Sequence, residues 1–229
     1  MDPKRDDSSS TQDKAYGYLK DAIVNGAYKP NQRLKVLQIA ERLEISRTPV
    51  KEALGRLAQE GLVTRDLGSG YVVQGLSVRE ILDLYRVREV LEVEAAREAL
   101  PNLNDQVVQE MRETLAQADK LLAQPHFNEF LRVNRKFHNI IVAQTQNKVL
   151  QQILSGLDAR FWSIGTVVVS RHPQRAKDIR QENRAILDAL IAGDVRRVEK
   201  AVRAHVRGAA NHVRLFIERE PHRFYIAAA

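Results

Sequence analysis

Cysteine is absent from the 229-residue sequence, and so is any apolar run of the roughly 18 residues that a transmembrane helix needs. Without cysteine the chain has neither disulfide bonds nor thiolate metal ligands, which fits a cytoplasmic protein. The N-terminal segment MDPKRDDSSSTQDK is polar and does not resemble a signal peptide, so we expect no contact with a membrane. With 44% hydrophobic and 28% charged residues, the composition is that of a globular protein of one large or two modest domains.

The excess of positive charge is modest and is spread along the chain. The net charge is +7, which hints at an anionic partner. Residues 1–75 contain 12 Lys and Arg against 10 Asp and Glu, and the remainder contains 24 against 19. The placement of individual charges, rather than their sum, must therefore identify the partner.

Helical periodicity dominates the chain and predicts a mostly α protein. We expect a flexible tail over residues 1–13, a small domain over residues 14–75, an all-α bundle over residues 76–220 and a second tail over residues 221–229. The small domain contains a helical pattern from Lys14, two short helical patterns, VLQIAERL and SRTPVKEALGRLAQEG, and a hairpin around Gly68. The six helices of the bundle are expected near residues 77–100, 104–123, 126–145, 147–170, 174–192 and 194–218.

The segment ISRTPVKEAL predicts a short helix with one apolar and one polar face. Ser46 is a suitable N-cap, and Pro49 falls in the first turn, where its missing N–H costs nothing. Arg47 and Lys51 are four residues apart and point away from the apolar face, with Thr48 beside them. The free N–H groups at the start of such a helix also attract phosphate.

A helix, a tight turn, a second helix and a hairpin together predict a winged helix-turn-helix, whose second helix enters the major groove of DNA. In that fold Arg47 can read guanine, whereas Thr48 and Lys51 suit phosphates and base edges. Gly68, at the tip of the hairpin, would let the backbone approach the minor groove. The alternative is a capped surface helix whose charges are only solvated.

The segment PNQRLKVLQIAERLEISRTPVKEALGRLAQEGLVTRDLGSGYVV resembles the DNA-binding domain of the GntR family of bacterial transcription regulators, and the resemblance covers residues 14–75. Lys51 stands where the family usually has arginine, and Glu44 stands where it usually has glycine in the turn. A residue other than glycine in a left-handed turn costs about 1 kcal/mol. The resemblance implies contacts with double-stranded operator DNA by Ser46, Arg47, Thr48, Lys51 and Gly68, with Arg33 as a further candidate.

Polar residues interrupt the apolar stripes of four bundle helices. They are Arg88, Asn134, His138, Asn183 and His205. An unpaired polar group in a core costs about 1–3 kcal/mol, so these residues need one another, water or a ligand. Together they predict a polar cavity, the usual ligand site of a helical bundle. Asn134 and His138 are four residues apart, and with His205 from another helix they could also gather a divalent metal ion.

The segments NRKFH, QENRAILDALIAGD and AVRAH resemble the effector-binding FCD domain of the FadR-like branch of the GntR family. The resemblance implies a metal such as Zn or Ni, held by an aspartate, a histidine four residues later and two further histidines. His138 and His205 match this set, whereas Asn134 occupies the aspartate position and Asn183 a histidine position. The segment fits either a weak metal site of His138, His205 and Asn134 or a metal-free pocket that binds its ligand by hydrogen bonds, and we favour the pocket.

The resemblance also places Arg88 in the cavity, where a buried arginine could clamp an organic acid. Its alternative role is a salt bridge to Glu92 or to an acid of another helix. We expect Arg171, Arg175 and Arg180, near the loop before the fifth helix, to form a solvated face.

These patterns predict a DNA-binding transcription regulator and not an enzyme. We expect a homodimer that binds a palindromic operator and acts as a repressor released by a small organic acid in the bundle. The alternative is a metal-dependent helical hydrolase or lyase that uses His138 and His205 and carries a DNA-binding module. Against the enzyme stands Asn134 in place of an acid.

Overall fold

The structure, a computed structural model, describes residues 10–24, 27–66, 70–75, 78–122, 127–172 and 174–219. The chain divides into two compact units, residues 1–75 and 76–229, and each is described by itself. Both are mainly helical, and the first contains a small sheet, so the predicted fold class is confirmed. Within the described ranges, none of the helices has both the length and the apolar character that crossing a membrane requires.

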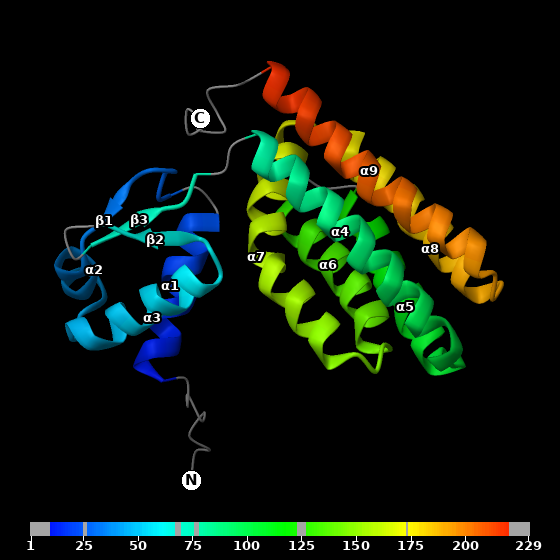
Figure 1. Ribbon diagram of the computed structural model, residues 1–229, viewed down its shortest axis with the longest axis horizontal. Helices are drawn as coiled ribbons and strands as arrows, with labels where there is room; N and C mark the ends of the chain where they lie inside the picture. The colour runs from blue at the N-terminus through cyan, green and yellow to red at the C-terminus, as the bar shows by residue number, and fades with distance from the viewer. Residues whose placement is uncertain are drawn as a thin grey trace, which may run out of the picture. The chain divides into compact units, whose positions relative to one another are not determined.

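The first unit is a winged helix-turn-helix (Figure 1). Its sheet is antiparallel with the strand order β1-β3-β2. The expected hairpin is formed by β2 and β3, and β1 adds a third strand that the sequence did not predict, with Arg33 opposite Val72. In chain order the elements are α1 (Thr11–Val24), β1 (Arg33–Leu34), α2 (Val36–Leu43), α3 (Arg47–Gln59), β2 (Val63–Arg65) and β3 (Tyr71–Val73).

Helix α1 begins three residues before the expected Lys14, so residues 11–13 are helical and are not part of a tail. The cause is a cap at Ser10, whose Oγ accepts a hydrogen bond from the Asp13 N–H at 3.1 Å and donates one to the Asp13 carboxylate at 2.8 Å. The remaining tail residues, 1–9 and 221–229, lie outside the described part of the chain.

The tight turn between α2 and α3 is made by Glu44, whose φ of 55° and ψ of 40° lie in the left-handed region. Its N–H bonds the carbonyl of Glu41, and the next N–H, of Ile45, bonds that of Ala40, so the last carbonyls of α2 are satisfied. Glutamate therefore occupies a conformation that favours glycine, as expected from the sequence.

The second unit is a bundle of six long helices. Every helix end lies within two residues of its expected position, which confirms that part of the prediction. In the described part of this unit the structure adds a short 3₁₀ turn, η1 (Leu100–Asn102), after the first helix. The helices are α4 (Val78–Ala99), α5 (Asp105–Leu122), α6 (Phe127–Ala143), α7 (Lys148–Arg171), α8 (Gln174–Ile191) and α9 (Val195–Arg219).

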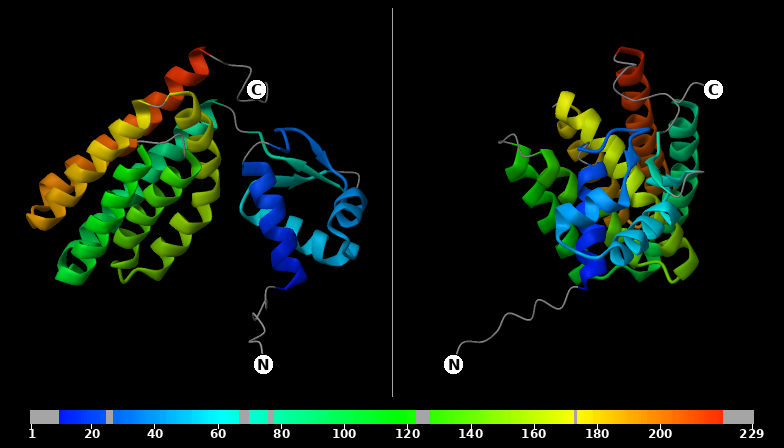
Figure 2. Two further views of the ribbon diagram at one scale, coloured as in Figure 1. Left: turned by 180° about the vertical axis from the view of Figure 1, so that it is seen from behind. Right: turned by 90° about the vertical axis from the view of Figure 1, so that its left-hand side faces the viewer.

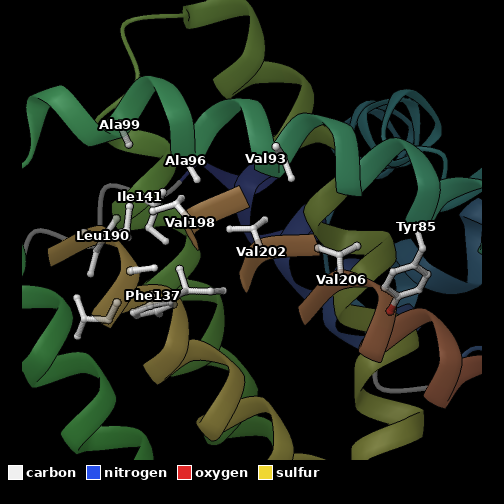
Figure 3. Close-up of a cluster of buried hydrophobic side chains, with 14 of the residues drawn as sticks. Tyr85, Val93, Ala96, Ala99, Phe137, Ile141, Leu190, Val198, Val202 and Val206 are labelled. Atoms are coloured by element: carbon white, nitrogen blue, oxygen red, sulfur yellow. The ribbon is translucent and has the colours of Figure 1, made fainter. Parts of the chain in front are cut away.

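The core of the bundle gathers around α9. Figures 1 and 2 show α9 lying along both α4 and α8. In Figure 3, Val93 and Ala96 of α4 point toward Val198 and Val202 of α9, and Phe137 of α6 closes the cluster from below. All five side chains are buried, and this apolar packing fixes the positions of the polar groups on the same helices.

Candidate functional site

The first unit presents a basic surface at the N-terminus of α3. Val50, Ala53 and other apolar residues of this helix are buried, and Arg47, Thr48 and Lys51 are exposed on its other face. Among the described residues, neither Arg47 nor Lys51 makes an ion pair. Two unneutralised cations at the positive end of a helix dipole favour an anion such as a DNA phosphate.

Ser46 is the N-cap residue of α3, with extended backbone angles, but its side chain makes no capping hydrogen bond. Its exposed hydroxyl is therefore not committed within the helix. Arg33 lies on β1 and is also exposed, but it is paired with Asp66 at the end of β2. Gly68, the sixth residue predicted to contact DNA, lies outside the described residues.

A polar cluster at the C-terminal end of α3 links this helix to α1. The Tyr16 hydroxyl donates to Glu60 at 2.5 Å, and the Lys20 ammonium donates to the same carboxylate at 2.9 Å. The Arg56 guanidinium lies 3.8 Å from the centre of the Tyr16 ring. Because these contacts link the two helices at several points, α1 fixes the orientation in which α3 presents Arg47.

The second unit contains a cluster of polar side chains between its helices, which we call the polar centre. It includes all five residues that the sequence singled out. The polar centre consists of Arg88 and Glu92 from α4, Asn134 and His138 from α6, Arg175, Glu182 and Asn183 from α8, and His205 from α9.

The α4 part of the polar centre is an ion pair. The Arg88 Nε donates to Glu92 Oε1 at 2.5 Å, and the guanidinium lies 4.6 Å from the centre of the Phe161 ring. Burial raises the pKa of Glu92, but the charges of Arg88, His138 and His205 and the hydrogen bond from Arg88 together outweigh burial and lower the pKa to about 2. The salt bridge that the sequence left as the alternative role of Arg88 is therefore formed.

His138 lies against the same carboxylate, with its Nδ1 3.4 Å from Glu92 Oε2. Burial lowers the pKa of His138 to about 3, because desolvation outweighs the attraction of Glu92. The imidazole is thus neutral near pH 7. Its ring stacks on that of His205, with 4.7 Å between the centres, so α6 and α9 meet here.

The α8 part of the polar centre is a second ion pair, which the sequence did not predict. Arg175 is only 2% exposed and donates to both oxygens of Glu182, at 2.6 and 2.9 Å. The His205 Nδ1 lies 2.8 Å from the same carboxylate. Burial raises the pKa of Glu182, but hydrogen bonds from His205 and Arg175 outweigh it, and the net effect lowers the pKa. A Cβ on Gly208 would lie 2.8 Å from Glu182 Oε1, which explains a glycine in the middle of α9.

The prediction that Arg175 belongs to a solvated face is therefore wrong. Arg175 lies four residues before Ile179 and eight before Asn183, which places it on the buried face of α8. The sequence contained this spacing, but the basic residues around Arg175 favoured the prediction of a solvated face. Arg180 is partly exposed and pairs with Asp119 of α5. The side chain of Arg171 lies outside the described part of the structure.

Two buried polar atoms of the polar centre have no partner among the described residues. Asn183 Nδ2 donates to Asn134 Oδ1 at 2.7 Å, so the two amides bond one another at the positions where the resemblance to the FCD domain implies an aspartate and a histidine. Within the described part of the chain, His138 Nε2 and Asn183 Oδ1 are buried and have no hydrogen-bond partner. Such atoms mark a place where a ligand or a solvent molecule binds.

The polar centre does not fit a tightly bound divalent cation. The two imidazoles and two amides include no anionic ligand, and both carboxylates beside them are engaged with arginines. Over the described ranges, no group of three or more His, Cys, Asp and Glu is placed to hold a metal ion. Divalent sites of this kind usually have three or four strong ligands, which Asn134 and Asn183 do not supply.

Comparisons with known proteins find a matching family for each of the two units. Residues 11–73 match the family of bacterial regulatory proteins called gntR, and residues 83–208 match the FCD domain. The HTH-type transcriptional regulator YdhC of Bacillus subtilis is 24% identical over 204 residues, which cover 89% of this chain and 91% of YdhC. The HTH-type transcriptional repressor GlaR of Escherichia coli is 26% identical over 201 residues, 83% of this chain and 90% of GlaR.

The solved structure of E. coli McbR/YncC has the same fold, with a TM-score of 0.79 at 23% identity over 91% of this chain and 99% of that chain. The winged helix-turn-helix with its basic helix and the helical bundle thus both have counterparts in this family. The chain belongs to the GntR family of bacterial regulatory proteins, with an FCD domain as its second unit, and is a DNA-binding transcription regulator.

Proposed function

We propose that this regulator binds a palindromic operator as a homodimer and represses transcription until a small organic acid binds in the polar centre. The observation that carries the DNA part is the exposed, unneutralised pair of Arg47 and Lys51 at the start of α3. GntR-family regulators bind operator DNA and typically act as dimers, and GlaR is named a repressor. DNA binding in a bacterial cell also implies a cytoplasmic location.

Effector binding is supported by the unpaired acceptors of the polar centre. A guanidinium carries five N–H donors, so the bond from Arg88 Nε to Glu92 does not exhaust this side chain, and it can also receive the carboxylate of an organic acid. Arg88 and Glu92 lie on α4, the helix that follows the DNA-binding unit in the chain. A ligand that shifts this ion pair would therefore move α4 and change the spacing of the two reading helices in a dimer.

We propose that the dimer forms through an apolar surface on α4 and α7. Leu91 of α4 packs with Leu150 and Leu154 of α7, and large apolar side chains next to this contact are exposed. These are Val87 (49%), Val90 (65%), Val149 (65%) and Ile153 (46%). A second copy of the chain would cover them. Light scattering should show a monomer for Val90→Glu and an unchanged dimer for Ile191→Glu, whose residue is also exposed but lies at the end of α8.

The operator test uses DNA selected from a random-sequence pool and fluorescence anisotropy. Arg47→Ala should weaken specific binding by about 1–3 kcal/mol, whereas Arg112→Ala, an exposed arginine of the bundle, should not change it. Lys51→Ala should reduce the slope of log affinity against log salt by about 1 if Lys51 contacts phosphate. Unchanged operator affinity in Arg47→Ala would show that α3 is not the reading helix.

We infer no enzymatic activity for this chain. The polar centre, as described, pairs each carboxylate with an arginine and contains no side chain placed as a nucleophile beside a base. The test is whether the effector that releases the operator is chemically unchanged after the assay. A regulator leaves the effector unchanged, and its conversion into another compound would favour the enzyme.

A further inference from the structure

The two unpaired acceptors of the polar centre specify the chemistry of the group that meets them. The first is His138 Nε2. The Glu92 carboxylate lies 3.4 Å from Nδ1 and attracts a hydrogen rather than a lone pair, so we place the proton of the neutral imidazole on Nδ1. Nε2 therefore has a free lone pair and no hydrogen.

The second acceptor is Asn183 Oδ1. In the structure the amide nitrogen of Asn183 donates to Asn134 Oδ1, which leaves the oxygen of Asn183 as the free end of the amide. Asn134 lies one helical turn before His138 on α6, so the Asn183 amide is held beside the same face of α6 as the imidazole. Two lone pairs are thus buried in one neighbourhood.

A plain carboxylate does not match these acceptors, because its oxygens would face two lone pairs. Two N–H or O–H hydrogens match them, and a single hydroxyl supplies only one. One amino group or two neighbouring hydroxyls supply both. A metal ion would also accept the lone pairs, but among the described residues no group of three or more His, Cys, Asp and Glu is placed to hold it.

We infer that the polar centre recognises its effector through a pair of donor hydrogens, from an amino group or a vicinal diol, which bind His138 Nε2 and Asn183 Oδ1 directly and without a metal. The inference rests on the proposed function, since it requires that the effector enters the bundle. It narrows the class of organic acid to amino acids and polyhydroxy acids. Plain acids and 2-oxo acids, which lack the donors, bind weakly.

The test is isothermal titration of the full chain, in EDTA, with four matched acids. The probes are 2-aminobutanoate, 2,3-dihydroxybutanoate, 2-oxobutanoate and butanoate, followed by the corresponding acids with six carbons. The amino or the dihydroxy member should bind at least about tenfold more tightly than the other two, and which of them does so identifies the donor. Asn183→Leu should abolish this preference, and Asn139→Leu, an exposed amide on α6, should retain it.

Equal binding of all four acids, binding by none in either set, or a preference that requires added Zn²⁺ or Ni²⁺ would overturn the inference. A second measurement does not depend on the probes. NMR of the histidine ring nitrogens, assigned with His138→Asn, should show His138 Nε2 without a proton, and a protonated Nε2 would also refute the inference.

These outcomes are separate from those of the proposed function. An acid that releases the operator but lacks donor hydrogens contradicts only the inference. An Arg47→Ala variant with full operator affinity contradicts only the proposed reading helix.

Discussion

Replacing Arg175 by methionine tests whether the second ion pair holds the bundle together. Arg175 is 2% exposed and makes two hydrogen bonds to Glu182, whose side chain is 21% exposed. Removing one partner of a buried pair costs about 3–5 kcal/mol, because the other charge stays buried without compensation. Since Glu182 keeps its contact with His205 and part of its hydration, we expect the lower end, about 3 kcal/mol.

The loss can be measured in the bundle alone. The single tryptophan of the chain, Trp162, lies in α7, so its fluorescence during urea unfolding reports the second unit. For a domain of this size, about 3 kcal/mol corresponds to a fall in Tm of about 6–12 °C. The double variant Arg175→Met/Glu182→Met should recover most of the loss, because an apolar pair replaces the ions without leaving a charge.

An exposed ion pair supplies the control. Arg214 and Glu218 lie one turn apart on α9 at 3.3 Å, and both are about half exposed. Arg214→Met should change the free energy of unfolding by no more than about 0.5 kcal/mol. If Arg175→Met costs no more than Arg214→Met, or if the double variant is the least stable of the set, the pair does not stabilise the bundle as described.

Three further predictions concern the same region. The double variant Asn134→Asp/Asn183→His, which introduces an acid and a third imidazole, should bind Zn²⁺ or Ni²⁺ tightly in equilibrium dialysis, and the wild-type chain should bind neither ion tightly. Equal metal binding by the variant and the wild type would show that the two amides do not weaken the site. The pKa of His138 falls to about 3 on folding, so between pH 7 and pH 5 the unfolded chain takes up a proton at this residue that the folded chain does not. Lowering the pH from 7 to 5 should therefore reduce the free energy of unfolding by about 2 kcal/mol more in the wild type than in His138→Gln. Urea titrations at the two pH values would measure this difference. Gly156→Ala should stabilise α7 by about 0.5–1 kcal/mol, because its Cβ contacts no other atom. Gly208→Ala should instead destabilise the bundle, because its Cβ would lie against the Glu182 carboxylate. An equal rise in Tm for both variants would contradict the close approach of Gly208 to Glu182.

Periodicity predicted the helices well because each has one continuous apolar face and a marked end. The bundle helices were placed within two residues, and the polar interruptions Arg88, Asn134, His138, Asn183 and His205 proved to lie together. This worked because a polar residue inside an apolar stripe must lie where the stripes of several helices meet.

Features that depend on partners far along the chain were not predictable. Strand β1 has two residues and no strand pattern of its own, and it exists because Tyr71 and Val72 pair with it. Glu182 was missed because one of its partners, His205, comes from another helix, and a single carboxylate on a charged helix carries no signal of burial. Arg175 was judged by its basic neighbours rather than by its phase on α8.

The hydrogen bond between Asn134 and Asn183 has a consequence for how a bacterium could use this regulator. Two amides neither gain nor lose protons over the physiological range of pH, and they compete poorly for transition metals. The aspartate and third histidine that the resemblance to the FCD domain implies would need a cation to complete the site, whereas this chain keeps its own internal bond. If the proposed effector binds there, its binding would not depend on the supply of zinc in the cell.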